Sequence, residues 1–200
     1  MNVVDSRPDL ADATVDVLAR TFSKNPLHVA AFGTDAVVKR NRVFFHVGLS
    51  LFCGRRLVVI GGSKILGFMH WVDSPGCNFS VGQRLSLVPA MLRGFGIKSS
   101  LRVGSWLSTW AKNDHTCLHW HFGPIGVDRE NQGKGVGRLL MEIFCSALDE
   151  NAALGFLETD KQENVGFYKR FGFEVVKEVQ VIGTTTYFMA RAGRAAKLTA

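Results

Sequence analysis

The sequence predicts an α/β (α+β) fold in which a sheet is flanked by helices. Short β-branched and apolar runs alternate along the chain with stretches whose apolar residues recur at helical spacing. Residues His119–Leu148 form one continuous strand, glycine-rich loop and helix. With 200 residues, 46% hydrophobic and 20% charged, the chain has the balance of one globular domain. We expect that domain over residues 1–191 and a flexible tail over residues 192–200.

The first part of the chain is predicted to form a strand and two helices. Residues Asn2–Asp5 suit a short strand, and a helix start follows it at once. This helix should end near Asn25, because the residue before a proline disfavours the helical conformation. Thr34 or Asp35 would cap a second helix that runs to about Phe52.

A hairpin and a long insertion come next. The runs Leu57–Ile60 and Ile65–Val72 are separated by Gly-Gly-Ser-Lys, which predicts two antiparallel strands joined by a tight turn. Residues 73–80 carry a Pro-Gly turn signal and predict a loop. Val81–Leu92 and Lys98–Lys112 then read as two helices broken by a Gly-Phe-Gly segment.

The last part of the chain returns to strands around a short helix. Leu154–Thr159 is predicted as a strand, Glu163–Phe171 as a helix, and Phe173–Ile182 as a second strand. Gly183 begins a turn into a final strand, Thr185–Ala190.

The glycine-rich loop is the main candidate for a binding site. Gly133, Gly135 and Gly137 lack a Cβ atom, so the backbone can adopt positive φ and approach a ligand closely. The free N–H groups of the following helix, together with Lys134 and Arg138, suit a phosphate or pyrophosphate. An ordinary strand-to-helix turn is the alternative for the glycines alone.

Two familiar phosphate-binding loops do not fit these residues. A P-loop requires Ser or Thr after Gly-Lys, whereas Gly135 follows Lys134 here. The dinucleotide-binding fingerprint has the pattern G-x-G-x-x-G, whereas this loop reads G-x-G-x-G. Neither nucleotide-binding class is therefore indicated.

The pattern Gln132-x-x-Gly135-x-Gly137 after an apolar strand resembles the acetyl-CoA loop of the GNAT superfamily of N-acetyltransferases. A second signature follows in the same order as in that family, with an asparagine, an aromatic-tyrosine pair and a Gly-Phe pair. These residues are Asn164, Phe167, Tyr168, Gly172 and Phe173. The C-terminal part, including Leu-Glu-Thr at 157–159, is most similar to puromycin N-acetyltransferase-like members. The resemblance covers residues 118–191 well and the N-terminal half loosely.

This resemblance implies a GNAT fold with a mixed, mostly antiparallel central sheet that is splayed at the cofactor strand. It also implies acetyl-CoA as the acyl donor. The strand residues would pair with the pantetheine arm near a bulge, with the Val127 N–H facing the thioester oxygen, while the loop would hold the pyrophosphate. The implied cofactor-binding residues are Ile125, Gly126, Val127, Gln132, Gly133, Lys134, Gly135, Val136, Gly137, Arg138 and Asn164. Asn164 would bind pantetheine or cap the helix that carries it.

Two residues are candidates for proton transfer. Tyr168 matches the motif tyrosine of the family, and a phenol is protonated at neutral pH and can donate to a thiolate leaving group. A core aromatic on a short helix is the alternative. Glu158, near the end of its strand, could act as the general base, with a solvated or salt-bridged carboxylate as the alternative. No enzyme nucleophile is required, because transfer would be direct within a ternary complex.

Three histidines lie near the predicted site. His119 and His121 share one face of their strand, and His70 lies near the end of the hairpin. Without Cys or acidic partners at ligand spacing, we interpret this pair as structural or pocket-lining and expect no metal site. Trp71, Trp106 and Trp110 indicate a compact apolar acceptor pocket, with its specificity in the insertion.

The expected acceptor is the amine of a small molecule, with a peptide or protein amine as an alternative. A non-catalytic acetyl-CoA-binding sensor is a second alternative. The net charge of +7 would also allow nucleic acid, but no run of five basic residues occurs, so neither nucleic acid nor a membrane is expected as a partner. Four cysteines without ligand or disulfide spacing and no apolar leader favour the reducing cytoplasm. We expect a monomer or a homodimer, a choice that the sequence does not decide.

Overall fold

The computed structural model of the protein describes residues 1–74, 76 and 81–194. Its strands form a seven-stranded sheet in the order β1-β2-β3-β4-β5-β7-β6, and neighbouring strands are antiparallel except β4 and β5, which are parallel. This confirms the predicted fold class. The strands are β1 (Asn2–Asp5), β2 (Arg55–Gly61), β3 (Lys64–Asp73), β4 (Trp120–Val127), β5 (Leu154–Thr159), β6 (Glu174–Val181) and β7 (Thr184–Ala192).

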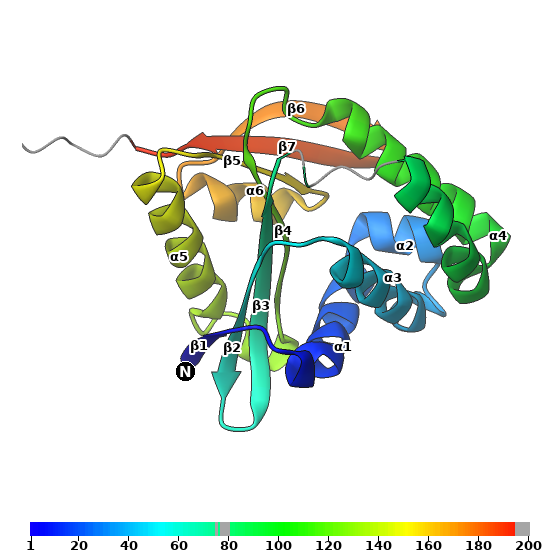
Figure 1. Ribbon diagram of the computed structural model, residues 1–200, viewed down its shortest axis with the longest axis horizontal. Coiled ribbons are helices and arrows are strands. Elements are labelled where there is room, and N and C mark those ends of the chain that lie inside the picture. Colours follow the sequence, from blue (N-terminus) through cyan, green and yellow to red (C-terminus); the bar gives the residue numbers. More distant parts are fainter. Residues whose placement is uncertain (75, 77–80, 195–200) are drawn as a thin grey trace, which may run out of the picture.

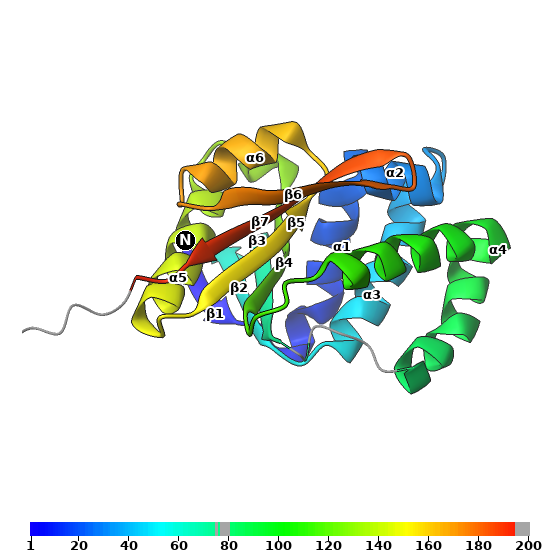
Figure 2. The same cartoon turned by 90° about the horizontal axis from the view of Figure 1, so that it is seen from above.

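Helices flank this sheet on both sides. Helices α5 and α6 share one face, α1 and α3 pack on the other, and α2 and α4 lie beyond them, to the right in Figure 1 and again in Figure 2. The helices are α1 (Ala11–Thr21), α2 (Pro26–Phe32), α3 (Val37–Leu51), α4 (Val81–Asn113), α5 (Val136–Glu150) and α6 (Gln162–Lys169). In the described part of the chain, none of them is both long and apolar enough to cross a membrane.

The helical predictions hold except in two places. The N-cap residue of α3 is Ala36, so neither Thr34 nor Asp35 caps this helix as predicted. The first helix ends at Thr21 and a 3-10 turn follows, but α2 then begins directly at Pro26, where no helix was expected. Proline stops a preceding helix, yet it also suits the first position of a new one, because the N–H that it lacks has no partner there. The break predicted inside the insertion lies at Gly96, whose backbone has φ 75° and ψ 169°.

The predicted loop at residues 73–80 and the predicted tail at residues 192–200 both extend outside the described residues. The loop predicted over residues 73–80 lies mostly outside the described residues. At the C-terminus, β7 continues through Ala192, and the backbone N–H groups of Gly193 and Arg194 donate to the Ala153 carbonyl and the Asp149 carboxylate. Residues 195–200 of the expected tail lie outside the described part.

The sheet opens between β4 and β5. The two strands are paired only at Trp120 with Gly155 and at His121 with Phe156. On the other side of β4, Met69 of β3 pairs with Ile125 and Trp71 pairs with Phe122, so β4 carries one extra residue there. This bulge includes Pro124, which has no N–H to donate to a neighbouring strand. The predicted bulge and splay are both present.

Separate clusters of apolar side chains fix the two sides of the sheet. On one side, α5 packs through a helical stripe, and its Phe144 ring stacks on Phe122 of β4 at 4.3 Å between centroids. On the other side, Leu18 of α1 and Phe45 of α3 cover the fully buried Phe68 of β3. Because adjacent residues of a strand point to opposite faces, β2 and β3 contribute to both clusters.

A further cluster joins the insertion to the rest of the molecule. Its members come from α2, α3, α4 and the end of β6: Leu27, Ala31, Phe32, Val37, Phe95, Val103, Trp106 and Val181. His28 of α2 lies among these rings, 5.0 Å from Trp106 and 5.5 Å from Phe45 between ring centroids. Its Nδ1 lies 2.8 Å from Oδ1 of the buried Asn41, whose own amide donates to the Ala19 carbonyl.

The burial of His28 makes stability depend on pH. Burial lowers the pKa of His28 from 6.5 to about 4, so between these values the unfolded chain binds the proton and the folded chain does not. The free energy of unfolding should therefore fall as the pH falls from 6.5 to 4, by about 3 kcal/mol from this residue. Urea unfolding across this range measures it.

The matched variant is His28→Phe, which keeps a ring in the same cluster but cannot titrate. It should be less stable than the wild type at pH 7, because Asn41 loses a donor. Its unfolding free energy should also fall less steeply below pH 6.5. An unchanged slope would show that His28 is not the responsible group.

Candidate active site

One large cleft of about 1390 Å³ runs along the opening in the sheet. One end is lined by β4, the glycine-rich loop, the end of β5 and α6. The other end is lined by aromatic and aliphatic side chains of α2, α3 and α4, including Phe44, Phe45, Met91, Trp106, Leu107 and Trp110. Between these ends lie ionisable side chains: His70, Asp114, His121, Glu158 and Asp160. The cleft therefore has one end formed by the β4 strand and the glycine-rich loop, a polar middle and an apolar end.

The backbone groups at the end of β4 point alternately toward β3 and toward the opening in the sheet. The Asp128 N–H donates to the Leu66 carbonyl of β3 at 2.9 Å. Since successive backbone groups of a strand point in opposite directions, the Val127 N–H points away from β3, toward the opening. The Val127 carbonyl accepts from the Thr21 hydroxyl at 3.2 Å and from the Gln132 side-chain amide at 3.1 Å. Gln132 therefore ties the loop to the strand.

The glycine-rich loop has the predicted left-handed geometry at two of its three glycines. Gly133 has φ 74° and Gly135 has φ 86°, whereas Gly137 lies within α5 and is not among the positive-φ glycines. A Cβ at Gly137 would stand 3.5 Å from Val127 Cγ2, an ordinary contact. The expectation of unusual backbone freedom is thus wrong for Gly137. Gly135 is the N-cap residue, so the free N–H groups of α5 begin directly after it.

The basic residues of the loop are exposed. Lys134 is exposed, and the Arg138 side chain is 75% exposed, with its Nε donating to Glu142 at 2.7 Å on the next turn of α5. An exposed ion pair of this kind contributes little to stability. Arg138 can therefore leave Glu142 and bind another anion at little cost. Val136 is different, because it is buried under β3 and serves the core.

Two predicted residues lie on α6. The Asn164 side-chain amide donates to the Thr159 hydroxyl at 3.2 Å, across the β5–α6 turn. The N-cap position is held by Lys161, so the expectation that Asn164 caps the helix is wrong. Tyr168 is buried and lines the cleft. Burial, with the nearby charge of Asp160, raises the pKa of the Tyr168 phenol above its usual range, which keeps it protonated.

Glu158 is part of a buried polar group. Its side chain is 3% exposed, and Oε2 lies 3.1 Å from Nε2 of His121. Oε1 is buried without a hydrogen-bond partner in the described part of the chain. Asp114 lies 3.2 Å from His119 Nε2 and 3.7 Å from His121 Nδ1. The expectation that these histidines have no acidic partner is therefore wrong.

The sequence analysis missed Asp114 and Asp160. Asp114 follows the insertion helix, and its spacing to the two histidines, D-x4-H-x-H, was a readable signal once both were placed on a strand. Asp160 accepts from the Leu27 N–H at 2.7 Å and from the Asn25 amide at 3.2 Å. Its role depends on α2, which the sequence did not reveal.

Trp71 and His70 have surroundings that differ from those predicted for an acceptor pocket. Trp71 does not line this cleft; it faces α5, with its ring 5.4 Å from Phe144 and 6.1 Å from Trp120. His70 lines the cleft, but its Nδ1 lies 3.1 Å from the Gly123 carbonyl, and burial lowers its pKa to about 4. A neutral histidine that donates to the bulge holds the strand in place.

Comparisons with known proteins identify similar domains and folds. Residues 100–175 match the family model of the acetyltransferase (GNAT) domain. A Corynebacterium glutamicum structure, described as histone acetyltransferase HPA2 and related acetyltransferase, has a TM-score of 0.75 at 16% identity and covers 98% of each chain. A GNAT family acetyltransferase from Brucella melitensis, solved with acetyl-CoA, has a TM-score of 0.52 at 17% identity, over 96% of this chain and 86% of that one.

A third similar structure is the ribosomal-protein-S18-alanine N-acetyltransferase of Escherichia coli. It has a TM-score of 0.57 at 12% identity and covers 100% of this chain and 97% of the other. The fold is therefore that of the GNAT acetyltransferases. Together, the matched domain and this fold support an acetyl-CoA-dependent N-acetyltransferase.

Gly135 offers a direct test of the loop. A Cβ added there would meet nothing within 4 Å, but φ is 86°, so Gly135→Ala should strain the loop by about 1–2 kcal/mol and weaken acetyl-CoA binding. The matched control is Gly62→Ala in the β2–β3 turn, with φ 62° and equally open space. Both variants should lose similar stability in urea unfolding, and only Gly135→Ala should lose affinity by calorimetry. Equal affinities would contradict a role of the loop in binding.

Proposed function

We propose that this protein transfers the acetyl group of acetyl-CoA directly to an amine of a small molecule, within a ternary complex. The observation that supports it most is the single cleft, which brings a donor end, a polar middle and an apolar end into one line. The amine nitrogen would attack the thioester carbonyl, the C–S bond would break, and the thiolate would take up a proton.

The donor would lie along the opening between β4 and β5. Ile125, Gly126 and Val127 present a strand edge that β5 does not pair with, which suits an extended arm carrying amide groups. The Val127 N–H would face the thioester oxygen as negative charge develops on it. Gln132, Asn164 and the loop from Gly133 to Arg138 complete the proposed site for the donor.

Tyr168 would protonate the departing thiolate. A phenol is protonated at neutral pH and can donate to a thiolate, and Tyr168 lines the cleft. Burial raises the pKa of this phenol further, which keeps the proton on the ring without making it a stronger acid. Tyr187, the other tyrosine of the chain, lies on β7 and does not line the cleft. This difference supports Tyr168 rather than Tyr187 as the proton donor.

Glu158 would accept the proton of the amine. The carboxylate is buried and lines the cleft, with one oxygen against His121 and the other without a partner in the described part of the chain. A buried carboxylate oxygen without a donor is under-satisfied, and the N–H of an incoming amine would supply the missing hydrogen bond. The C-terminal similarity to puromycin N-acetyltransferase-like members includes this Leu-Glu-Thr segment.

The acceptor end favours a compact apolar amine. Trp106 and Trp110 pack edge to face, 5.2 Å between ring centroids, and both indole Nε1 atoms are buried without partners in the described part of the chain. Flat apolar walls with a few polar points are typical of small-molecule pockets. An apolar ring system bearing an amine fits this end.

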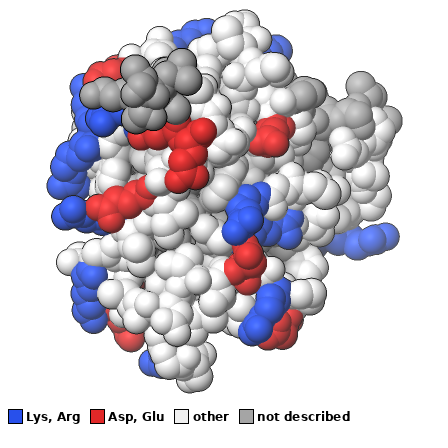
Figure 3. All heavy atoms as spheres, turned by 60° about the vertical axis from the view of Figure 1, so that its left-hand side comes forward, with Lys and Arg blue, Asp and Glu red and all other residues white. Residues whose placement is uncertain are grey.

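A peptide amine and a non-catalytic sensor are the competing functions. Some structural neighbours carry names that include a protein substrate, such as the ribosomal-protein-S18-alanine enzyme. The net charge of +7 also raises nucleic acid as a partner. On the face shown in Figure 3, acidic side chains lie among the basic ones, so that face presents no continuous basic surface.

The test combines calorimetric titration with acetyl-CoA and a thiol-release assay over small amines, including puromycin, and peptides. Binding with turnover of a small amine supports the proposal. Turnover of peptides alone would assign a protein acceptor, and binding without turnover of any acceptor would favour the sensor. Absence of binding would contradict the donor site itself.

The acid and base roles predict losses of turnover without losses of donor binding. Tyr168→Phe should lower kcat by about 10²-fold, the usual contribution of a positioned proton donor, and Glu158→Gln should also lower kcat. Acetyl-CoA affinity should stay near the wild-type value in both. Tyr187→Phe is the matched control and should keep full turnover. Unchanged kcat in Tyr168→Phe would assign this ring to packing.

Substitutions at the acceptor end should change the KM for the acceptor and leave acetyl-CoA affinity unchanged. Trp110→Phe keeps an aromatic wall and removes one N–H, so KM for the acceptor should rise about 3- to 10-fold, the effect of one hydrogen bond. Acetyl-CoA affinity should not change. Trp71→Phe, on the α5 side of the sheet, should change neither constant. Equal effects of Trp110→Phe on acceptor and donor would contradict this placement of the acceptor.

A further inference from the structure

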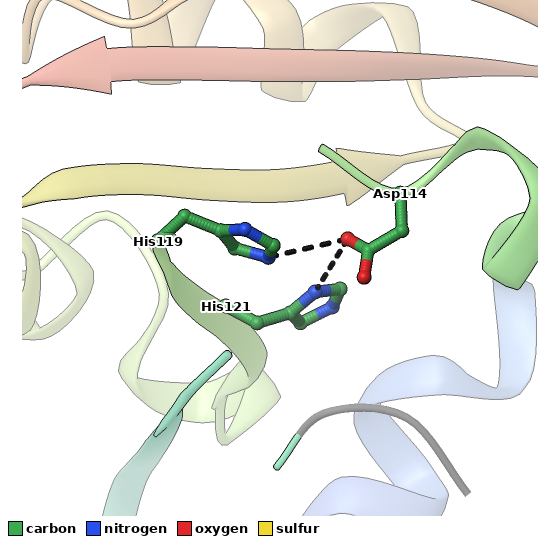
Figure 4. A group of neighbouring side chains, drawn as sticks. All are labelled: Asp114, His119 and His121. Atoms are coloured by element: carbon green, nitrogen blue, oxygen red, sulfur yellow. Dashed lines mark ion pairs between the residues drawn. The ribbon is translucent and has the colours of Figure 1, made fainter. Parts of the chain in front are cut away.

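Asp114, His119 and His121 form a compact cluster beside the polar middle of the cleft. In Figure 4 the imidazole rings of His119, just before β4, and His121, within it, project toward the Asp114 carboxylate, which approaches from the end of the insertion. One ligand atom from each residue can be chosen so that all three atoms lie within 4.8 Å of one another. The cluster combines two imidazoles and one carboxylate, a donor set typical of Zn²⁺.

The hydrogen bond on the far side of His119 fixes its tautomer. His119 Nδ1 lies 2.9 Å from the Cys117 carbonyl, which can only accept, so Nδ1 carries the proton. In the neutral ring Nε2 is then the atom that can bind a metal, and it lies 3.2 Å from an Asp114 oxygen. Either a metal ion between the two atoms or a second proton on the ring makes this contact favourable. The side chain of His119 is 0% exposed, so bulk water does not screen the pair.

His121 repeats this arrangement with a second outer partner. Its Nε2 lies 3.1 Å from the Glu158 carboxylate, which assigns the proton to Nε2. The lone pair of Nδ1 then faces the same Asp114 oxygen, 3.7 Å away. Metal-binding histidines generally donate their other N–H to a carboxylate or a backbone carbonyl. Glu158 and the Cys117 carbonyl are outer partners of this type.

We propose that Asp114, His119 and His121 bind one Zn²⁺ ion through the Asp114 carboxylate, His119 Nε2 and His121 Nδ1. Ligand atoms about 2.0–2.1 Å from a tetrahedral Zn²⁺ lie about 3.3–3.5 Å apart, close to the 3.2 and 3.7 Å found from Asp114 to the two rings.

The surroundings suit an ion with one position left for a further ligand. Asp114 and His121 line the cleft, while His119 lies behind them, so a fourth position would face the space assigned to the acceptor. Bound to His121 Nδ1, the ion would also fix the proton on Nε2 toward Glu158. The site thus lies next to the proposed base, yet its metal affinity does not depend on acetyl transfer.

The experiment measures metal binding directly, on untagged protein freed of metal by chelator and dialysis. Calorimetry with zinc chloride should show one Zn²⁺ per chain, and Co²⁺ should give the visible absorption bands of a tetrahedral site. Asp114→Asn and His121→Gln should each weaken Zn²⁺ by more than about 10²-fold, and Glu158→Gln by about 10- to 100-fold. Circular dichroism shows whether each variant is folded.

Two control variants separate this site from adventitious binding. His46→Gln removes an exposed histidine of α3, and Cys117→Ser removes an exposed thiol while keeping the carbonyl that fixes His119. Both should bind Zn²⁺ like the wild type. Absence of Zn²⁺ binding, or binding lost only in Cys117→Ser, would overturn the proposal. These titrations contain no acetyl-CoA, so their failure leaves the acetyl-transfer test unaffected.

Discussion

The brief parallel pairing of β4 and β5 is the constraint on which the rest of the structure depends. Two residue pairs join the strands, and beyond His121 they separate. The bulge with Pro124 prevents regular pairing on the β3 side and removes one donor. Everything proposed for donor binding uses the strand edge that this separation leaves open, and the cleft exists because the two parts of the sheet diverge there.

Local patterns were sufficient to predict most of the fold. Strand alternation identified β1 to β7, and the helical stripe of α5 identified the element behind the glycine-rich loop. Helix α2 was missed because Pro26 was interpreted only as an end, although the same ring geometry suits a beginning. The surroundings of Trp71 were also missed, because which face of a strand meets which helix depends on packing between distant elements.

The candidate site was predictable where it follows a sequence motif. Gly133, Gly135, Val127 and Tyr168 lie on the cleft as the resemblance implied. The polar group around Glu158 could not be predicted in this way, since Asp114 and His121 reach it from the insertion and from β4. Their meeting depends on how the insertion returns to the sheet, a long-range property that neither spacing nor composition fixes.

Asp160 has a mechanical consequence. It follows β5 directly and holds the first turn of α2 through the Leu27 N–H and the Asn25 amide. The strand that carries Glu158 and the helix that carries His28 are therefore joined at one half-buried carboxylate, and removing it would leave the Leu27 N–H without this acceptor. A shift of α2 relative to the end of β5 would have to break these two hydrogen bonds, so they hold the wall of the acceptor end in a fixed position relative to the strand that carries Glu158.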